Sequence, residues 1–338
     1  MDSAARHHHP GLDGLRGIAA LAVLAHHVGV LRDWAGPFDH AYLAVDFFFL
    51  LSGYVIALAY EQRLREGLGL GAYLRIRLAR LLPMVVLGAG LGAALLFMQG
   101  ESWSSIGLGL VCALAFLPML AHPGSLYPLN DVQWSLFFEL LVNILHAKVA
   151  DVSNRTLALT VAISALALIW ANLHWGTLDV GWKRDNFIGG LPRAIFSFGL
   201  GLLMHRWQTG SRLPRWILPY PLVACLLTVL VAWPTVDTRL DWLWVLVFFP
   251  LLMVTAIHAR PDHWLCRPAL LAGVLSYPLY ALHDPILDWA IGFRPQGAGS
   301  AMRAGFWLVV ILTCIGATVL AERYWDRPLR RLLKPTGT

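Results

Sequence analysis

Residues 40–60 read HAYLAVDFFFLLSGYVIALAY, a run of 21 positions in which Asp46 is the only carboxylate. About 20 consecutive, mostly apolar residues are the length that an α-helix needs to cross the hydrocarbon core of a bilayer. The run therefore predicts a transmembrane helix. Its one acid needs a reason to be there, because an ionisable group inside a membrane is costly.

The rest of the chain has the same character. Of its 338 residues, 58% are hydrophobic and 14% are charged, against about 45–50% and 25% in soluble proteins. This composition excludes a soluble enzyme, a disordered chain and a single-pass receptor. Eleven apolar runs follow one another with short connections and no shift in composition, which predicts a single domain over residues 1–338: 12–34, 40–60, 81–99, 105–121, 134–148, 156–176, 187–205, 217–235, 242–259, 271–292 and 303–322.

The arginines predict how the chain is oriented. Five of them lie in the connection 61–80 and four in the tail 323–338. Basic residues close to membrane segments mark the cytoplasmic side, so both stretches are expected there. Two crossings precede the connection 61–80, which places the N-terminal arm 1–11 on the same side. We expect an integral protein of the cell (inner) membrane with both termini in the cytoplasm.

This orientation limits the number of crossings. Eleven would place the two ends of the chain on opposite sides, so one apolar run must fail to span. The pattern breaks within 105–148, where Pro118, Pro128 and the polar stretch 130–133 occur. Non-helical backbone at membrane depth is tolerated where it lines a cavity or is buried in protein. The predicted fold is an all-α polytopic membrane protein with about ten transmembrane helices and one re-entrant segment around 105–148.

Charge and cysteine usage point to no further class of partner. The net charge of +6 comes from 26 basic against 20 acidic residues, and in a membrane protein such an excess sets topology more often than it binds nucleic acid. The four cysteines are far apart, and no pair has metal-ligand or redox spacing. We expect no nucleic-acid partner, no metal site and no permanently bound cofactor.

The first predicted helix carries two candidate functional residues. Arg16 and His27 are eleven positions apart, which is three helical turns, so they share one face at a separation of roughly 16.5 Å. An arginine at the membrane interface could hold an anion at the mouth of a cavity, and a deeper histidine could act as a general base. The alternative is that Arg16 only follows the positive-inside rule while His27 hydrogen-bonds to a neighbouring helix.

Two acids could serve the histidine. Asp46 lies in the second run at a depth that could match His27, where it would orient or charge the imidazole; otherwise it is an interfacial acid. Glu139 ends the stretch Trp134-Ser-Leu-Phe-Phe-Glu139. A buried carboxylate needs a cation or donors around it, and Arg16 or a protonated His27 would meet this need.

Two further clusters are candidates for binding. Arg75, Arg77 and Arg80 follow the second run, with Arg77 and Arg80 on one helical face. Guanidinium groups suit phosphates, although lipid headgroups would serve them equally. Late in the chain, Tyr280 and His283 share a face with Ser276 before Pro285, which should kink the helix and free backbone carbonyls. This cluster lines a polar cavity or joins helices.

Together these motifs resemble membrane-bound acyltransferase family three, the integral membrane O-acyltransferases of cell-envelope sugars. The resemblance extends from Gly11 to Pro328, and the order and spacing of its blocks make it specific. The matching blocks are Leu12-Asp-Gly-Leu-Arg16 with His27, Val45-Asp-Phe-Phe-Phe-Leu-Leu-Ser-Gly53, Arg77-Leu-Ala-Arg80, Trp134-Ser-Leu-Phe-Phe-Glu139, Leu275-Ser-Tyr-Pro-Leu-Tyr-Ala-Leu-His283 and Glu322-Arg-Tyr-Trp-Asp-Arg-Pro328.

The resemblance implies transfer of an acyl group, usually acetyl, from cytoplasmic acyl-CoA to a hydroxyl of an extracytoplasmic polysaccharide, glycan or lipid-linked sugar. The expected partners are acyl-CoA as co-substrate, the carbohydrate acceptor and membrane lipids. The residues expected to act are His27, Arg16, Glu139 and Asp46 in catalysis, Arg77, Arg80 and Arg75 in acyl-CoA binding, and Trp134, Tyr280 and His283 in substrate binding.

A different class of function uses the same residue types. A proton-coupled secondary transporter or flippase would also place His, Asp and Glu inside the membrane as a proton relay. Transporters often repeat their architecture, with broken helices in matching positions. The sequence shows no second copy of the Arg16–His27 helix, which disfavours this alternative.

Overall fold

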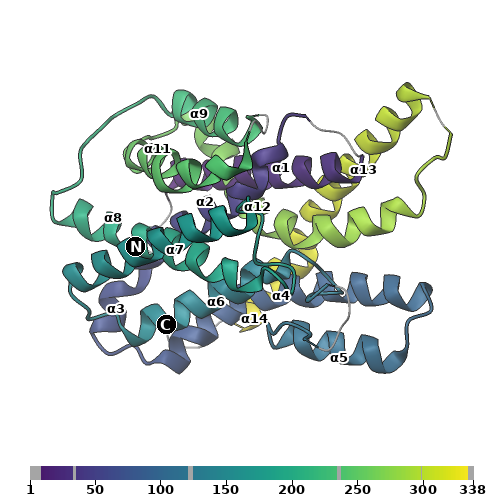
Figure 1. The fold of residues 1–338 in the computed structure, drawn as a ribbon, viewed down its shortest axis with the longest axis horizontal. Helices are drawn as coiled ribbons and strands as arrows, with labels where there is room; N and C mark the ends of the chain where they lie inside the picture. The colour runs from purple at the N-terminus through teal and green to yellow at the C-terminus, as the bar shows by residue number, and fades with distance from the viewer. Residues whose placement is uncertain (1–8, 33–35, 121–124, 234–236, 298, 334–338) are drawn as a thin grey trace.

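The computed structural model describes residues 9–32, 36–120, 125–233, 237–297 and 299–333, and every regular element in these ranges is helical (Figure 1). The two outermost parts of the predicted cytoplasmic ends, residues 1–8 and 334–338, lie outside the described residues. The prediction of an all-helical chain is confirmed.

Eight helical segments in the described ranges are long and apolar enough to cross a membrane, which confirms a polytopic membrane protein. Several combine a main helix with short flanking turns. The eight segments are α1 (Pro10–Leu31), Asp39–Arg65 with α2 (Ala44–Ile56) and α3 (Gln62–Arg65), α4 (Leu70–Met98), α7 (Asn154–Trp175), Phe187–Thr209 with α8 (Gly190–Thr209), Thr238–Ala256 with α10 (Asp241–Leu243) and α11 (Phe249–Ala256), α12 (His263–Ile291), and Ser300–Leu333 with α13 (Ser300–Ala321) and α14 (Arg327–Leu333).

The remaining helices are shorter. They are α5 (Trp103–Leu114), α6 (Gln133–Lys148) and α9 (Tyr220–Ala232). At about 1.5 Å per residue, α5 is about 18 Å long and α6 about 24 Å, both less than the roughly 30 Å of a hydrocarbon core. Between α5 and α6 the described residues form only turns and bends. The expected break in 105–148 is therefore present, and the count of ten crossings with one re-entrant segment stays a prediction.

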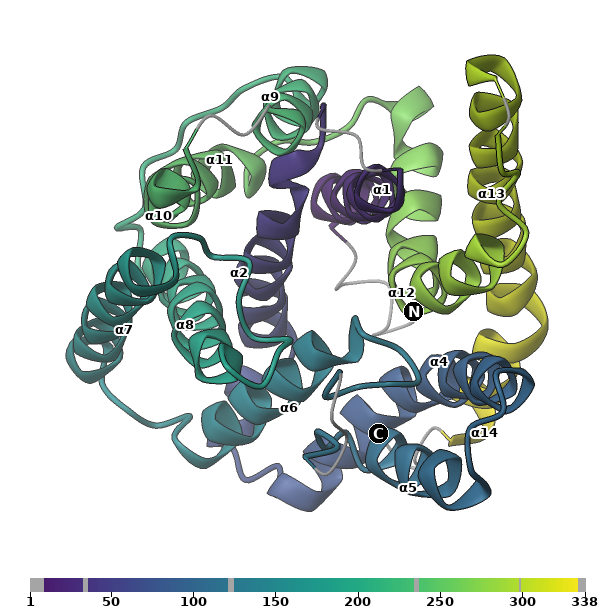
Figure 2. The same ribbon diagram turned by 45° about the vertical axis from the view of Figure 1, so that its right-hand side comes forward.

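Small residues set the closest helix contacts. α1 lies beside α12 in both ribbon views (Figures 1 and 2), and a methyl group added at Gly17 would collide with Ala272. α2 lies beside α8 in the same way, because a methyl group at Gly53 would collide with the backbone of Phe198. In a bilayer, apolar side chains gain no free energy by leaving the lipid. Helices therefore associate through close approach of their backbones.

Pro285 has the expected effect on α12. A proline inside a helix removes the hydrogen bond to the carbonyl four residues earlier, which here is the carbonyl of Ala281. Asn130 supplies the missing donor, because its side-chain amide donates to that oxygen at 2.8 Å. The next residue, Asp131, donates its backbone N–H to Asp284 at 2.7 Å. The irregular segment before α6 is thus attached to the kink of α12.

A buried arginine on α8 also holds helices together. Arg206 on α8 forms an ion pair with Glu61 and donates to the backbone carbonyls of Ala150 and Val152. Both charged side chains are almost completely buried. Loss of the partner of a buried charge is strongly destabilising, so the pair fixes the arrangement of the segments that carry it. This arginine therefore ties α8 to the connection between α6 and α7.

Candidate active site

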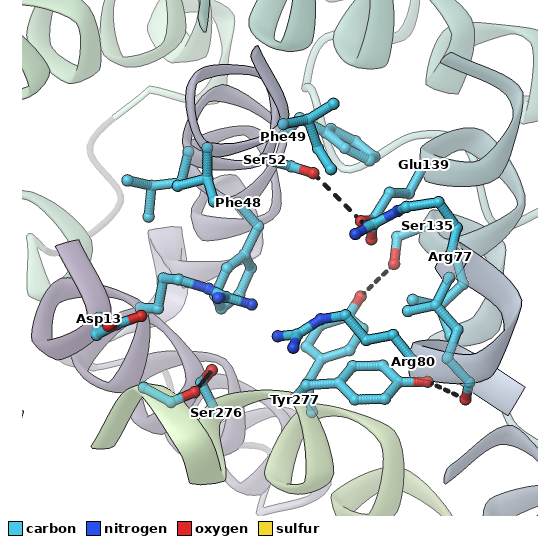
Figure 3. Close-up of a pocket in the computed structure, with 18 of the residues that line it drawn as sticks. Asp13, Phe48, Phe49, Ser52, Arg77, Arg80, Ser135, Glu139, Ser276 and Tyr277 are labelled. Atoms are coloured by element: carbon cyan, nitrogen blue, oxygen red, sulfur yellow. Dashed lines mark hydrogen bonds and ion pairs between the residues drawn. The ribbon is translucent and has the colours of Figure 1, made fainter. Parts of the chain in front are cut away.

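A cavity of about 320 Å³ lies among α1, α2, α4, α6 and α12, and the C-terminal helix contributes to its wall. The charged residues that line it come from distant parts of the chain, and several of them are shown in Figure 3. Two π-helical segments, 57–61 and 322–326, contribute Tyr60 and Asp326. Such insertions in α-helices frequently occur at functional sites. The charged side chains of the lining are Arg16, Arg77, Arg80, Arg330, Asp13, Glu139 and Asp326.

One ion pair forms part of this wall. Arg77 on α4 donates to Glu139 on α6 at 2.7 Å, and Ser52 on α2 donates to the same carboxylate oxygen at 3.2 Å (Figure 3). Asn143, one turn further along α6, donates to the backbone carbonyl of Glu139. Glu139 thus has a guanidinium and a hydroxyl as its partners. Its carboxylate therefore orients Arg77 at the cavity, while the expected contact with His27 is not formed.

Two other arginines of the lining have no such partner. Arg16 and Arg80 make no ion pair or hydrogen bond with any residue that the structure describes, and Figure 3 shows the Arg80 guanidinium directed into the cavity. Arg330, by contrast, is paired with Asp326 at 2.7 Å. Guanidinium groups form their strongest hydrogen bonds with carboxylates and phosphates. Within the part of the chain that the structure describes, these two guanidiniums of the cavity are therefore available to an anion.

His27 lies on α1, four residues before the helix ends at Leu31, and is half-buried. Its Nδ1 atom is 2.9 Å from the carbonyl oxygen of Val23. Because a carbonyl oxygen can only accept a hydrogen bond, Nδ1 must carry the proton of the neutral imidazole. The lone pair is then on Nε2, which has no partner among the described residues. In this tautomer His27 is ready to accept a proton.

His27 is not part of the cavity lining. Two aromatic residues of the lining, Phe48 and Tyr280, have rings that lie 5.7 Å apart, edge to face. Tyr280 is fixed by a hydrogen bond of 2.7 Å between its hydroxyl and Ser135. Its ring lies 5.8 Å from that of His283, and Nε2 of His283 lies 3.3 Å from Nδ1 of His27. Tyr280 and His283 thus connect the arginine-lined cavity to His27 through successive ring contacts.

The structure gives Asp46 a different role from the expected one. Asp46 and Arg193 form a completely buried ion pair with an N–O distance of 2.6 Å. Arg193 also donates to the backbone carbonyl of Val180 at 2.7 Å. A carboxylate away from water requires a cation, and packing of α8 against α2 supplies one. Asp46 therefore joins these two helices and makes no contact with His27.

Three further residues expected at the site fall outside the cavity lining. Trp134 is buried with its ring 5.1 Å from the guanidinium of Arg193, so it covers the ion pair with Asp46. Arg75 is exposed, because it lies on the opposite face of α4 from Arg77. His283, expected to bind substrate, is completely buried against His27. Of the expected site residues, the cavity brings together Arg16, Arg77, Arg80, Glu139 and Tyr280.

The cavity also contains residues that sequence reasoning did not single out as site residues. Asp13 lies one turn before Arg16 in the first block, so its position on the same face could have been noticed. Arg330 was counted only as a basic residue of the tail. Ser52 and Tyr277 gave no signal of their own, because hydroxyl groups are common in membrane helices. They belong to the site because α2 and α12 face the cavity.

The fold and cavity define a polytopic membrane protein with an arginine-lined cavity among its helices. A family model described as an acyltransferase domain matches residues 9–322, so the chain belongs to this acyltransferase family. This confirms the resemblance noted in the sequence and makes acyl transfer its activity. The same membership favours an acyltransferase over the transporter alternative.

Individual relatives agree. The chain is 26% identical over 338 aligned residues, covering 92% of this chain and 81% of the relative, to a candidate membrane-bound transacylase, BcsY, of Komagataeibacter xylinus. It is 38% identical to "Protein 2 in picA locus" of Rhizobium radiobacter, covering 47% of this chain and 92% of that protein. Candidate O-acetyltransferases of Staphylococcus aureus are 32% identical over 111 residues, 32% of this chain and 18% of theirs. No solved structure is significantly similar to the chain.

Proposed function

We propose that this protein transfers an acyl group, most simply acetyl, from cytoplasmic acyl-CoA to a hydroxyl of an extracytoplasmic polysaccharide, glycan or lipid-linked sugar. The observation that carries the proposal is a pair of guanidiniums, Arg16 and Arg80, that have no partner among the described residues. They line the same cavity as Tyr280, whose ring contacts His283 beside His27. The named relatives include a candidate transacylase and candidate O-acetyltransferases, which supports an oxygen acceptor.

The donor would bind from the arginine end of the cavity. Arg16 and Arg80 would contact the phosphates of CoA, with Arg77 held beside them by Glu139. Fork-shaped guanidiniums suit phosphate oxygens in number and geometry. The pantetheine arm would then direct the thioester toward Phe48 and Tyr280. In our proposal this mouth faces the cytoplasm of the cell (inner) membrane together with both termini, in agreement with the distribution of arginines.

The transfer step then needs only one proton carrier. The acceptor hydroxyl gives its proton to Nε2 of His27 as its oxygen attacks the thioester carbonyl carbon. The tetrahedral intermediate collapses, the carbon–sulfur bond breaks, and the thiolate of CoA takes the proton back from His27. The products are the acyl ester and free CoA thiol. General-base catalysis of this kind contributes about 10²–10⁴-fold.

The test is a transfer assay with the purified protein in lipid nanodiscs. Acetyl-CoA labelled in the acetyl group is mixed with a cell-envelope carbohydrate extract from the expression host, and both thiol release and label in the carbohydrate fraction are measured. We expect the two to rise together and to require the protein. If neither product forms while the protein is folded and acetyl-CoA is intact, acyl-CoA is not the donor and the proposal is overturned.

A further inference from the structure

The buried histidine on α12 is the group that the proposed reaction does not yet use. His283 is completely buried, where a polar ring requires hydrogen-bond partners. It lies against the face of α1 that carries His27, at the point where α12 is kinked by Pro285. Both of its ring nitrogens have partners, and these partners determine where its proton is.

The Nδ1 atom of His283 lies 3.1 Å from the carbonyl oxygen of Leu279. A carbonyl accepts only, so Nδ1 carries the proton and Nε2 carries the lone pair. This lone pair lies 3.3 Å from Nδ1 of His27. Nδ1 of His27 must itself be protonated, because it lies 2.9 Å from the carbonyl oxygen of Val23. The N–H of His27 therefore points at two acceptors, one of which is His283.

Only one arrangement of protons satisfies all three contacts when both rings are neutral. Each histidine donates from Nδ1 to the carbonyl four residues earlier in its own helix. The unprotonated Nε2 of His283 then accepts a hydrogen bond from His27. The unprotonated Nε2 of His27 is free to accept a proton from a substrate. The other tautomer of His27, with its proton on Nε2, would place the lone pair of Nδ1 against that of His283, which is repulsive.

We propose that His283 is a positioning residue for His27, which it holds in the tautomer that leaves Nε2 free as the base. This inference rests on the proposed function, because it concerns the same reaction. When His27 takes the proton of the acceptor hydroxyl, its imidazolium still donates through Nδ1. The lone pair of His283 then faces a positive ring, and a hydrogen bond to a charged group is stronger than one to a neutral group. The contact thus strengthens as the proton is transferred.

A substitution series on His283 tests this role. His283→Leu removes the acceptor, so we expect kcat for thiol release from acetyl-CoA to fall by about 10²-fold, the order that misplacement of a catalytic group produces. KM for acetyl-CoA should stay unchanged, because the arginine cavity is untouched. His283→Gln can return an oxygen close to the position of Nε2 and should recover most of kcat. A merely structural role would not distinguish Gln from Leu in this way.

His258 supplies the matched control. Its Nδ1 also bonds the carbonyl four residues earlier, Val254, at 3.1 Å, but it makes no contact with His27. His258→Leu should therefore keep kcat, and thermal unfolding in nanodiscs shows whether each variant is folded. If wild-type protein turns over acetyl-CoA and folded His283→Leu does so equally well, the positioning role is overturned while the proposed function stands. If wild-type protein has no turnover, the proposed function itself fails.

Discussion

Arg77 and Glu139 lie 62 positions apart in the sequence and form an ion pair of 2.7 Å in the wall of the arginine-lined cavity. The pair joins α4 to α6, and Ser52 adds a bond from α2. The carboxylate cancels one of the positive charges of the cavity and fixes the direction of one guanidinium. In our proposal, Glu139 therefore belongs to the donor-binding end of the site and is not the partner of His27.

Replacement of Glu139 tests that assignment. Glu139→Gln keeps an oxygen for Arg77 and Ser52 and removes one negative charge from the phosphate-binding region. Since the positive potential of the cavity rises, we expect KM for acyl-CoA to fall several-fold at low salt, with kcat little changed. Steady-state kinetics at two salt concentrations measure both. A large loss of kcat at unchanged KM would instead make Glu139 a partner of the base.

The guanidinium of Arg80 has no partner among the described residues, so its removal should weaken binding of acyl-CoA. Arg80→Ala should raise KM for acetyl-CoA by about 10-fold or more, since a charge-assisted hydrogen bond contributes about 1.5–3 kcal/mol. Arg75→Ala is the matched control on the same helix, because Arg75 is exposed and outside the cavity. Equal effects of the two substitutions would show that these arginines contribute only a general positive field.

The base itself is tested at His27. His27→Ala should lower kcat by about 10²–10⁴-fold, leave binding of acetyl-CoA intact and leave the protein in the membrane fraction. Binding can be followed by thermal stabilisation with CoA, which does not require turnover. Acylation close to wild type in a folded His27→Ala protein would remove this residue from the reaction.

The buried pair of Asp46 and Arg193 predicts a loss of stability and no direct loss of chemistry. Asp46→Asn alone leaves an uncompensated buried charge, which costs about 3–5 kcal/mol. The double change of Asp46→Leu with Arg193→Met removes both charges and should restore most of the stability, as measured by thermal unfolding in nanodiscs. The double variant should also retain acyl transfer. A stable but inactive double variant would return Asp46 to a catalytic role.

The aromatic rings of Phe48 and Tyr280 in the cavity wall predict a limit on the acyl group. Tyr280 is held by its hydrogen bond to Ser135, whereas the side chain of Phe48 makes only apolar contacts. Phe48 is therefore the ring that can move or be trimmed. Phe48→Ala should raise the ratio of kcat/KM for butyryl-CoA to that for acetyl-CoA. Because both substrates are measured with the same protein sample, a general loss of activity does not change this ratio. An unchanged ratio would exclude Phe48 from selection of the acyl group.

Much of the site could be predicted from the sequence because its elements are local. The helical period places Arg16 and His27 on one helix, and it separates Arg77 and Arg80 from Arg75. Pro285 predicted a free carbonyl, and the structure shows Asn130 bonded to it. The partners of the acids could not be predicted in this way. Asp46 and Arg193 are separated by 147 positions, and His27 and His283 by 256.

The sequence by itself determined that this protein is a multi-helix membrane protein of the acyltransferase family, since apolar length, composition and motif spacing are properties of each segment alone. Only the tertiary structure decided which cation each buried acid meets, and which lone pair each histidine presents. The physical reason is that, away from water, every charge and every N–H must find its partner on whichever helix packs beside it. Helix packing follows from small residues such as Gly17 and Gly53, which allow close approach. This packing brings Glu139 into contact with Arg77, Asp46 with Arg193, and His27 with His283.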